Sequence, residues 1–341
     1  MIRERNRGIT VRIIIAGAIG AALTLACGPA AHAGTFSSQQ ILVLGSAAVS
    51  AQAINDRGTI VGAYQPTSTQ QAGFILQGGA IYVLGGSVPT AVNRSGEVAG
   101  YGNNGGFVWQ NGSFLPGVSF SVSSVDGALP EVLLNNHGVI AYVEASQGAQ
   151  YVYAGTPQKP HVQKGLSTSH TVVTSINSHG VMAGFEVASV SGQPVPAVFV
   201  GKAGLYDVLV PNFSGFGNSA NAFVNDAGQV AFSDGQALYL FSNGAYTQVA
   251  MPASQVFGVQ VMGYNNSGRA VGIYTNSSQT PALQTVFYYN GHTVSTFGTY
   301  AAGDIVHVAL NDFGVMVVSD TPAGTASLGT SYRVTCRGTA C

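Results

Sequence analysis

The sequence predicts an all-β fold, a seven-bladed β-propeller of four-stranded antiparallel blades. A short Asn-x-x-Gly motif recurs at the same place in seven repeats, at intervals of 38 to 48 residues. A repeat of this length is typical of propeller blades. No stretch after residue 33 sustains the apolar spacing of an amphipathic helix. The motifs begin at Asn55, Asn93, Asn135, Asn177, Asn225, Asn265 and Asn311.

Each repeat contains four strand-like runs separated by turn residues. In the first repeat they read SAQAIN, TIVGAY, AGFILQ and AIYVLGG, and the second repeat follows the same plan. Short runs rich in Val, Ile, Phe and Tyr between Gly and Asn turns predict strands of one antiparallel sheet. The third run carries an aromatic residue in each repeat: Phe74, Phe107 with Trp109, Tyr151, Phe199, Tyr239, Phe287 and Tyr332.

The Asn-x-x-Gly motif predicts a tight turn between the first and second strands of a blade. An Asn at the first turn position can accept a hydrogen bond from the backbone two residues on, and Gly at the fourth supplies positive φ. The positions around this Asn and Gly differ from repeat to repeat. We therefore do not expect the side chains of Arg94 and Glu97 to build the blade. A ring of ligand-binding asparagines remains an alternative, whereas calcium loops would need further carboxylates. The turn glycines are Gly58, Gly96, Gly138, Gly180, Gly228, Gly268 and Gly314.

The two ends of the repeat region predict a closed ring. Residues 39–46 align with a fourth strand, and the last repeat stops after its third strand, TSYRVTC. If residues 39–46 pair with residues 328–336, the N-terminal strand completes the last blade and no sheet edge stays open. An open β-solenoid is the alternative.

Residues 1–33 read as a secretory signal peptide. A basic start with four Arg precedes an apolar run, and AHA ends at Ala33. A lipoprotein signal at Cys27 and a retained anchor are the alternatives. We therefore expect residues 34–341 to form a single propeller domain that is extracellular or periplasmic.

Charge and cysteines limit the classes of partner. Residues 34–341 hold 8 Lys and Arg against 12 Asp and Glu, a formal net charge of −4. Because the charges are few and scattered, we expect neither a basic stripe that binds nucleic acid nor a membrane-binding surface after signal cleavage. In an oxidising compartment, Cys336 and Cys341 predict a small disulfide at the C-terminus, with free or intermolecular thiols as the alternative.

The repeat resembles the bacterial extracellular HAF-repeat family, whose unit contains I-N-x-x-G and F-x-W-x-x-G elements. The resemblance covers nearly all of residues 39–335, and GGFVWQNG at 105–112 is the nearest copy of the second element. The sequence departs from the His-Ala-Phe triplet in every repeat, as in AGF and GGF. The resemblance implies a secreted, propeller-like protein without an assigned activity.

No nucleophile, zinc-protease or phosphate-loop motif is present, so the sequence predicts no catalytic residue, metal ligand or cofactor. The local candidates are Asp126 with Glu131 as a carboxylate pair, and His137 with His179 at equivalent turns. Solvated loop residues are the competing explanation of both pairs. Longer loops occur at 116–130, 187–197, 211–221 and 275–284.

We expect the long loops to share the face that usually binds ligands in propellers. Their polar, uncharged composition favours a glycan or an extracellular protein as partner. The sequence therefore predicts a secreted, non-enzymatic and monomeric binding or scaffold module. The alternatives are an extracellular polysaccharide hydrolase or lyase on a propeller scaffold and a purely structural repeat protein.

Overall fold

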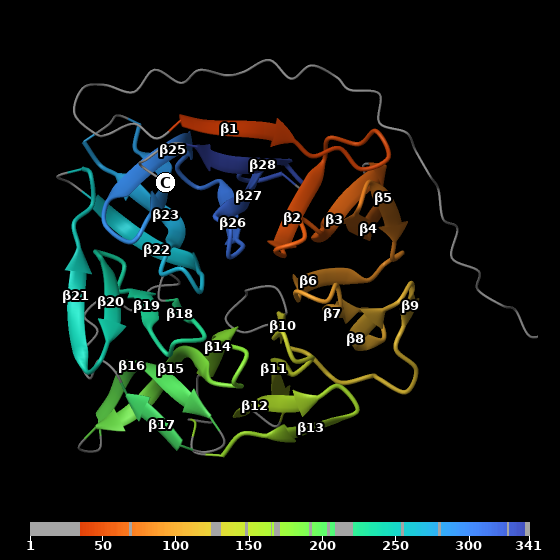
Figure 1. Cartoon of the computed structure of the whole chain (residues 1–341), viewed down its shortest axis with the longest axis horizontal. Coiled ribbons are helices and arrows are strands. Elements are labelled where there is room, and N and C mark those ends of the chain that lie inside the picture. Colours follow the sequence, from red (N-terminus) through yellow and green to blue (C-terminus); the bar gives the residue numbers. More distant parts are fainter. Residues whose placement is uncertain are drawn as a thin grey trace, which may run out of the picture.

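The computed structural model contains seven four-stranded antiparallel sheets, which are the blades of a closed β-propeller (Figure 1). It describes residues 35–337 apart from 68–69, 124–130, 147–148, 165, 167–170, 191–192, 203–204, 209–220, 254–255, 279–280 and 326. We number the blades 1 to 7 along the chain from β2. In the part of the chain described, no helix has the length and apolarity needed to cross a bilayer.

The innermost strands surround the central channel (Figure 1): β2 (Val49–Ile54), β6 (Val88–Val92), β10 (Val132–Leu134), β14 (Thr171–Ile176), β18 (Ala222–Val224), β22 (Val256–Tyr264) and β26 (Ile305–Leu310). The second strands are β3 (Ile60–Thr67), β7 (Val98–Gly102), β11 (Ile140–Ser146), β15 (Met182–Val190), β19 (Val230–Ser233), β23 (Ala270–Asn276) and β27 (Val315–Thr321). The third strands are β4 (Gln70–Gln77), β8 (Gly105–Gln110), β12 (Ala149–Thr156), β16 (Gln193–Lys202), β20 (Leu238–Ser242), β24 (Leu283–Tyr289) and β28 (Thr330–Arg337). The outermost strands are β5 (Ala80–Val83), β9 (Ser113–Phe114), β13 (Lys159–Val162), β17 (Leu205–Val208), β21 (Ala245–Val249), β25 (Val294–Ala301) and β1 (Thr35–Gln40).

The N-terminal strand closes the ring, as the sequence predicts. β1 pairs with β28 from Thr35 opposite Arg337 to Gln40 opposite Tyr332. The strand lies earlier in the chain than the predicted 39–46, because β28 extends to Arg337 and β1 pairs along this extension. Residues 43–46 instead form a tight turn, with a bridge between Val43 and Ser46, that leads inward to β2.

The hydrophobic core lies between the blades. Seven separate clusters of buried side chains occur, and each joins the facing sheets of two neighbouring blades. Since each sheet buries both faces against its neighbours, the strands read as runs rich in Val, Ile, Phe and Tyr. The cluster between blades 7 and 1, for example, packs Val317 of β27 against Val49 and Phe74.

A glycine in the second strand accompanies a β-bulge in the first strand of four blades. In blade 1 the bulge lies between Ala51 and Ala53, and a Cβ on the facing Gly62 would lie 2.1 Å from the carbonyl oxygen of Ser50. The bulge therefore brings the first-strand backbone into the volume that a side chain would fill. The same combination occurs at Gly100, Gly184 and Gly272. The three blades without a bulge carry Tyr142, Phe232 and Val318 at this place.

Tyr151 lies on the third strand of blade 3 as predicted, but a second tyrosine of that strand holds the position equivalent to Phe74. In blade 3, Tyr153 lies opposite Tyr142 and so occupies the place that Phe74 has opposite Gly62 in blade 1. Tyr151 lies opposite Glu144 one pleat further along. Two tyrosines separated by a single residue make the register ambiguous in the sequence, and only the strand pairing decides it.

The long loops occupy the expected connections. Residues 116–130 and 211–221 lie between blades, whereas 187–197 and 275–284 lie at second-to-third strand hairpins. Residues 124–130, 191–192, 209–220 and 279–280 fall outside the described part of the chain. The predicted signal peptide, Asp126 and Cys341 also lie outside the described residues, so the disulfide between Cys336 and Cys341 stays a prediction.

Candidate functional site at the mouth of the central channel

Each Asn-x-x-Gly motif forms a hydrogen-bonded turn at one end of the channel. In blade 7 the Gly314 N–H donates to the Asn311 carbonyl, and the Asn311 N–H donates to the Val315 carbonyl. The Asn311 Oδ1 accepts from the N–H groups of Phe313 and Val315. In all seven turns the Gly has a φ between 73° and 92°, a conformation that favours glycine. The turn thus has the geometry expected from the sequence.

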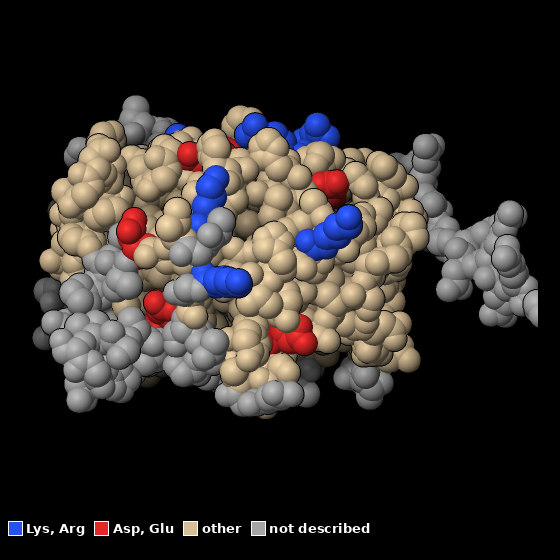
Figure 2. All heavy atoms as spheres, turned by 90° about the horizontal axis from the view of Figure 1, so that it is seen from below, with Lys and Arg blue, Asp and Glu red and all other residues tan. Residues whose placement is uncertain are grey.

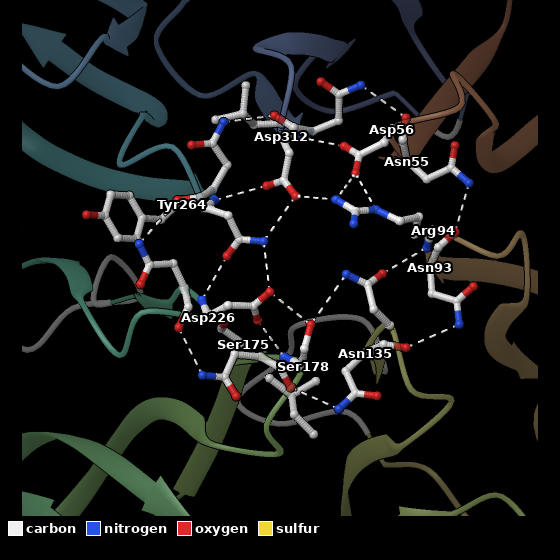
Figure 3. A pocket seen from close by; sticks show the side chains of 18 of the residues that line it. Asn55, Asp56, Asn93, Arg94, Asn135, Ser175, Ser178, Asp226, Tyr264 and Asp312 are labelled. Carbon is white, nitrogen blue, oxygen red and sulfur yellow. Dashed lines mark hydrogen bonds and ion pairs between the residues drawn. The ribbon is translucent and has the colours of Figure 1, made fainter.

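The same asparagines also join the blades to one another. The Nδ2 of each donates to the backbone carbonyl of the Asn in the next blade, at distances of 2.8 to 3.4 Å. The bond from Asn311 to Asn55 closes the ring (Figure 3). The side-chain amides are therefore used inside the protein, and the seven residues are only 2–5% exposed. The sequence alone does not predict this role, because bonds between blades have no local sequence pattern.

A second ring lies inside the ring of asparagines, nearer the axis, and is formed by the residue after each of them (Figure 3). At five of the seven junctions, a side-chain oxygen accepts a hydrogen bond from the backbone N–H of the equivalent residue in the preceding blade. Asp, Asn and Ser side chains are short enough to form such local bonds without crowding. The ring comprises Asp56, Arg94, Asn136, Ser178, Asp226, Asn266 and Asp312 (Figure 3).

Arg94 provides the only ion pairs described at this mouth. Its guanidinium donates to Asp56 Oδ2 at 2.8 and 2.9 Å and to Asp312 Oδ2 at 3.2 Å. The hydrogen bond and charge of Asp56 raise the pKa of Arg94. Every carboxylate oxygen of Asp56, Asp226 and Asp312 accepts at least one hydrogen bond from another blade. The Arg94 side chain thus joins blade 2 to blades 1 and 7, a role between blades that the repeat pattern does not predict.

Glu97 also differs from the expectation. Its Oε2 accepts from Asn93 Nδ2 at 2.6 Å, and its Oε1 accepts from Gln110 Nε2 at 2.7 Å. Glu97 thus connects the turn of blade 2 to the end of its third strand. A variable position in a repeat can still carry a structural contact of its own blade.

The rings enclose a polar cavity of about 180 Å³ at the channel mouth. The residues immediately before the seven asparagines form a mostly apolar ring in the lining of the cavity, here called the collar. The cavity is smaller than most ligand pockets, which measure about 300–1,000 Å³. Three Asp and one Arg give it a formal charge of −2. Donors and acceptors that satisfy one another around a ring are suited to hold blades together rather than to transfer protons. The collar comprises Ile54, Val92, Leu134, Ile176, Val224, Tyr264 and Leu310.

One histidine lies in the channel wall between blades 7 and 1. His307 of β26 donates from Nε2 to the carbonyl of Gln52 in β2 at 2.8 Å. Burial lowers the pKa of His307, and this hydrogen bond opposes the effect. His307 therefore joins blades 7 and 1 at the junction that closes the ring, where burial favours the neutral form of its imidazole.

The other sequence candidates do not assemble into a site among the described residues. His137 and His179 occupy adjacent turns, where their backbone N–H groups donate to Asn135 and Asn177. Glu131 lies just before β10, where burial raises the pKa of its carboxyl to about 7, whereas Asp126 lies outside the described part. No cluster of three or more His, Cys, Asp or Glu side chains that could hold a metal occurs in the described residues.

The fold and the mouth together define a class, the seven-bladed β-propellers, with a central ring of inter-blade asparagines as the particular feature of this chain. Virginiamycin B lyase from Staphylococcus aureus matches with a TM-score of 0.58 and 10% identity, over 89% of this chain and 100% of that chain. YCF48 from Cyanidioschyzon merolae matches with a TM-score of 0.52 and 11% identity, over 87% and 98% of the two chains. These similarities show a shared fold. No family model and no curated protein matches the sequence.

Proposed function

We propose that this chain is a secreted, non-enzymatic propeller that acts as a binding or scaffold module for a carbohydrate or an extracellular protein. The observation that carries the proposal is the use of all carboxylate oxygens at the channel mouth as acceptors for neighbouring blades. An acid–base pair needs carboxyl groups directed at a substrate. Here the mouth carboxylates support the ring instead.

The surface supports a neutral partner. Figure 2, a view of the ring from its side, shows on this face a few charged side chains of both signs spread among uncharged residues. Only 7% of the sequence is charged. Such a surface favours recognition by hydrogen bonds and aromatic contacts over long-range electrostatic attraction. Within the same fold, one structure of YCF48 holds a D1 peptide, with a TM-score of 0.54 to this chain. That example supports a protein as the second class of partner.

The experiment is a glycan array probed with residues 34–341, together with incubation of the protein with neutral and acidic polysaccharides. We expect retention on defined glycans and no new reducing ends or unsaturated sugar products. Release of such products by freshly purified protein, and not by a heat-unfolded sample, would contradict the non-enzymatic role and favour the hydrolase or lyase alternative.

A further inference from the structure

A second pocket lies between blades 1 and 2, outside the central channel. It has a volume of about 330 Å³, at the lower end of the range of about 300–1,000 Å³ for small-molecule sites. Its lining comes from the ends of β4 and β8, from β5 and from the β6–β7 and β8–β9 turns. It comprises Gln77, Tyr82, Ser95, Gly96, Glu97, Trp109, Gln110, Asn111 and Gly112.

Two aromatic rings form the apolar part of this pocket. Tyr82 lies against Trp109 with ring centroids 5.3 Å apart and an interplanar angle of 59°. Trp109 is 5% exposed and belongs to the core between the two blades, whereas Tyr82 is half-buried. A rigid aromatic base of this kind offers a contact surface at low entropic cost.

Three polar groups at the pocket have no hydrogen bond within the described residues. They are the Gln77 amide, the Tyr82 hydroxyl and the Trp109 indole N–H. The Gln77 Nε2 lies above the Gly96 turn, 3.0 Å from the place that a Cβ on Gly96 would take. Unused donors and acceptors beside aromatic rings are the combination that orients a polar ligand in a pocket.

The charges around the pocket balance one another. Glu97 is the only acidic residue in the lining, and Gln110 and Asn93 already donate to its two oxygens. At the rim, the Arg57 guanidinium donates to the Ser95 carbonyl at 3.4 Å. One anion, Glu97, and one cation, Arg57, therefore border the site. Both are hydrogen-bonded within the protein, so the pocket has no net charge that would attract a charged ligand.

We propose that this pocket, hereafter the blade 1–2 pocket, binds one residue of a neutral oligosaccharide. A pyranose ring presents C–H faces that suit Tyr82 and hydroxyl groups that can pair with Gln77, Tyr82 and the Trp109 N–H. This inference rests on the proposed binding function and specifies its site and ligand class.

The chain contains a single tryptophan, so the fluorescence of Trp109 reports directly on the blade 1–2 pocket. Residues 34–341 are titrated with cellohexaose, mannohexaose, xylohexaose and maltohexaose, and with an oligogalacturonate as the acidic comparison. We expect a saturable change of Trp109 fluorescence with at least one neutral oligosaccharide. Gln77→Ala should weaken that binding about five- to tenfold, the value of one hydrogen bond, and Tyr82→Phe should weaken it about threefold.

The matched controls are Gln248→Ala and Tyr246→Phe on β21, where both side chains are exposed on another blade. They should leave the titration unchanged, and thermal unfolding should show that all four variants are folded. Two results would show that the blade 1–2 pocket is not the binding site while leaving the proposed function intact. One is binding on the glycan array without a change in Trp109 fluorescence, and the other is an unaltered affinity of the Gln77→Ala variant. Binding of the oligogalacturonate alone would overturn the neutral class. Absence of binding to every glycan would overturn this inference and the carbohydrate part of the proposed function.

Discussion

Asn311 and Asn55 are 256 residues apart in the sequence, yet the Nδ2 of Asn311 lies 3.0 Å from the backbone carbonyl oxygen of Asn55. This bond is the closing member of the asparagine ring at the channel mouth. At the outer edge of the same blade, β1 pairs with β28. The ring is therefore closed twice, once by side chains at the axis and once by strands at the periphery.

Replacing Asn311 with Asp should destabilise the protein by about 1–3 kcal/mol, because the change keeps the turn acceptor and removes the donor to a buried carbonyl. Urea unfolding of purified residues 34–341 measures the effect. Asn276→Asp is the matched control, since Asn276 accepts bonds from Ser278 in an exposed turn and its change should cost less than about 0.5 kcal/mol. Equal effects at the two positions would show that the ring bond contributes nothing measurable.

Gly62→Ala should destabilise blade 1 by about 2–4 kcal/mol, because a Cβ would meet the bulged backbone of β2 and neither strand can move without disturbing the core. The Cβ would lie 2.1 Å from the Ser50 oxygen. Gly86→Ala is the control, since its Cβ would meet only Asn103 Nδ2 at 3.6 Å. The midpoints of thermal unfolding compare the two. A Gly62→Ala protein as stable as wild type would contradict the role assigned to the bulge.

The protein should lose stability on acidification through His307. Its pKa is lowered in the folded state by burial, so the unfolded state binds more protons below the ordinary histidine pKa of about 6.5. The contribution of His307 to the free energy of unfolding is complete above that pH. It is lost progressively as the pH falls toward the lowered pKa of His307 in the folded state. Because the raised pKa of Glu131 acts in the opposite direction in this range, the sign is tested by the difference in urea midpoint between wild type and His307→Gln at several pH values between about 7.5 and 5. His307→Gln should flatten the dependence, and an unchanged slope in the variant would assign the effect to other groups.

Deletion of residues 34–40 should remove the closure at the periphery and weaken the ring. The deletion removes β1, leaves β28 with an unpaired edge, and removes Phe36, whose ring lies 4.6 Å from Phe297. Loss of this side chain alone is worth about 2–4 kcal/mol, and an exposed edge favours association with other chains. Thermal unfolding and size-exclusion chromatography should show a lower midpoint and larger species. The chain beginning at residue 34 is the control and should remain folded and monomeric.

The N-terminus provides a separate prediction. If the signal peptide is cleaved after Ala33, the mature protein begins at Gly34, one residue before β1 starts at Thr35. Cleavage there would release the hydrophobic leader and keep the closing strand intact. The intact mass of protein recovered from the medium or periplasm should equal that of residues 34–341. A lipid-modified mass beginning at Cys27 would instead identify a lipoprotein.

By itself, the sequence determined the blade count, the four-strand plan, the turn chemistry and the closure by an N-terminal strand. These depend on short-range patterns, which recur every 38 to 48 residues and so reinforce one another. The tertiary structure alone decided what each pattern contacts: the Asn311 bond to Asn55, the second ring of Asp, Asn, Ser and Arg, and the register that selects Tyr153 over Tyr151. The blade 1–2 pocket also required it, because Gln77, Tyr82 and Trp109 come from two repeats whose facing surfaces meet only when the sheets pack. Contacts between repeats depend on how the blades are placed around the axis, and no local pattern in the chain encodes that placement.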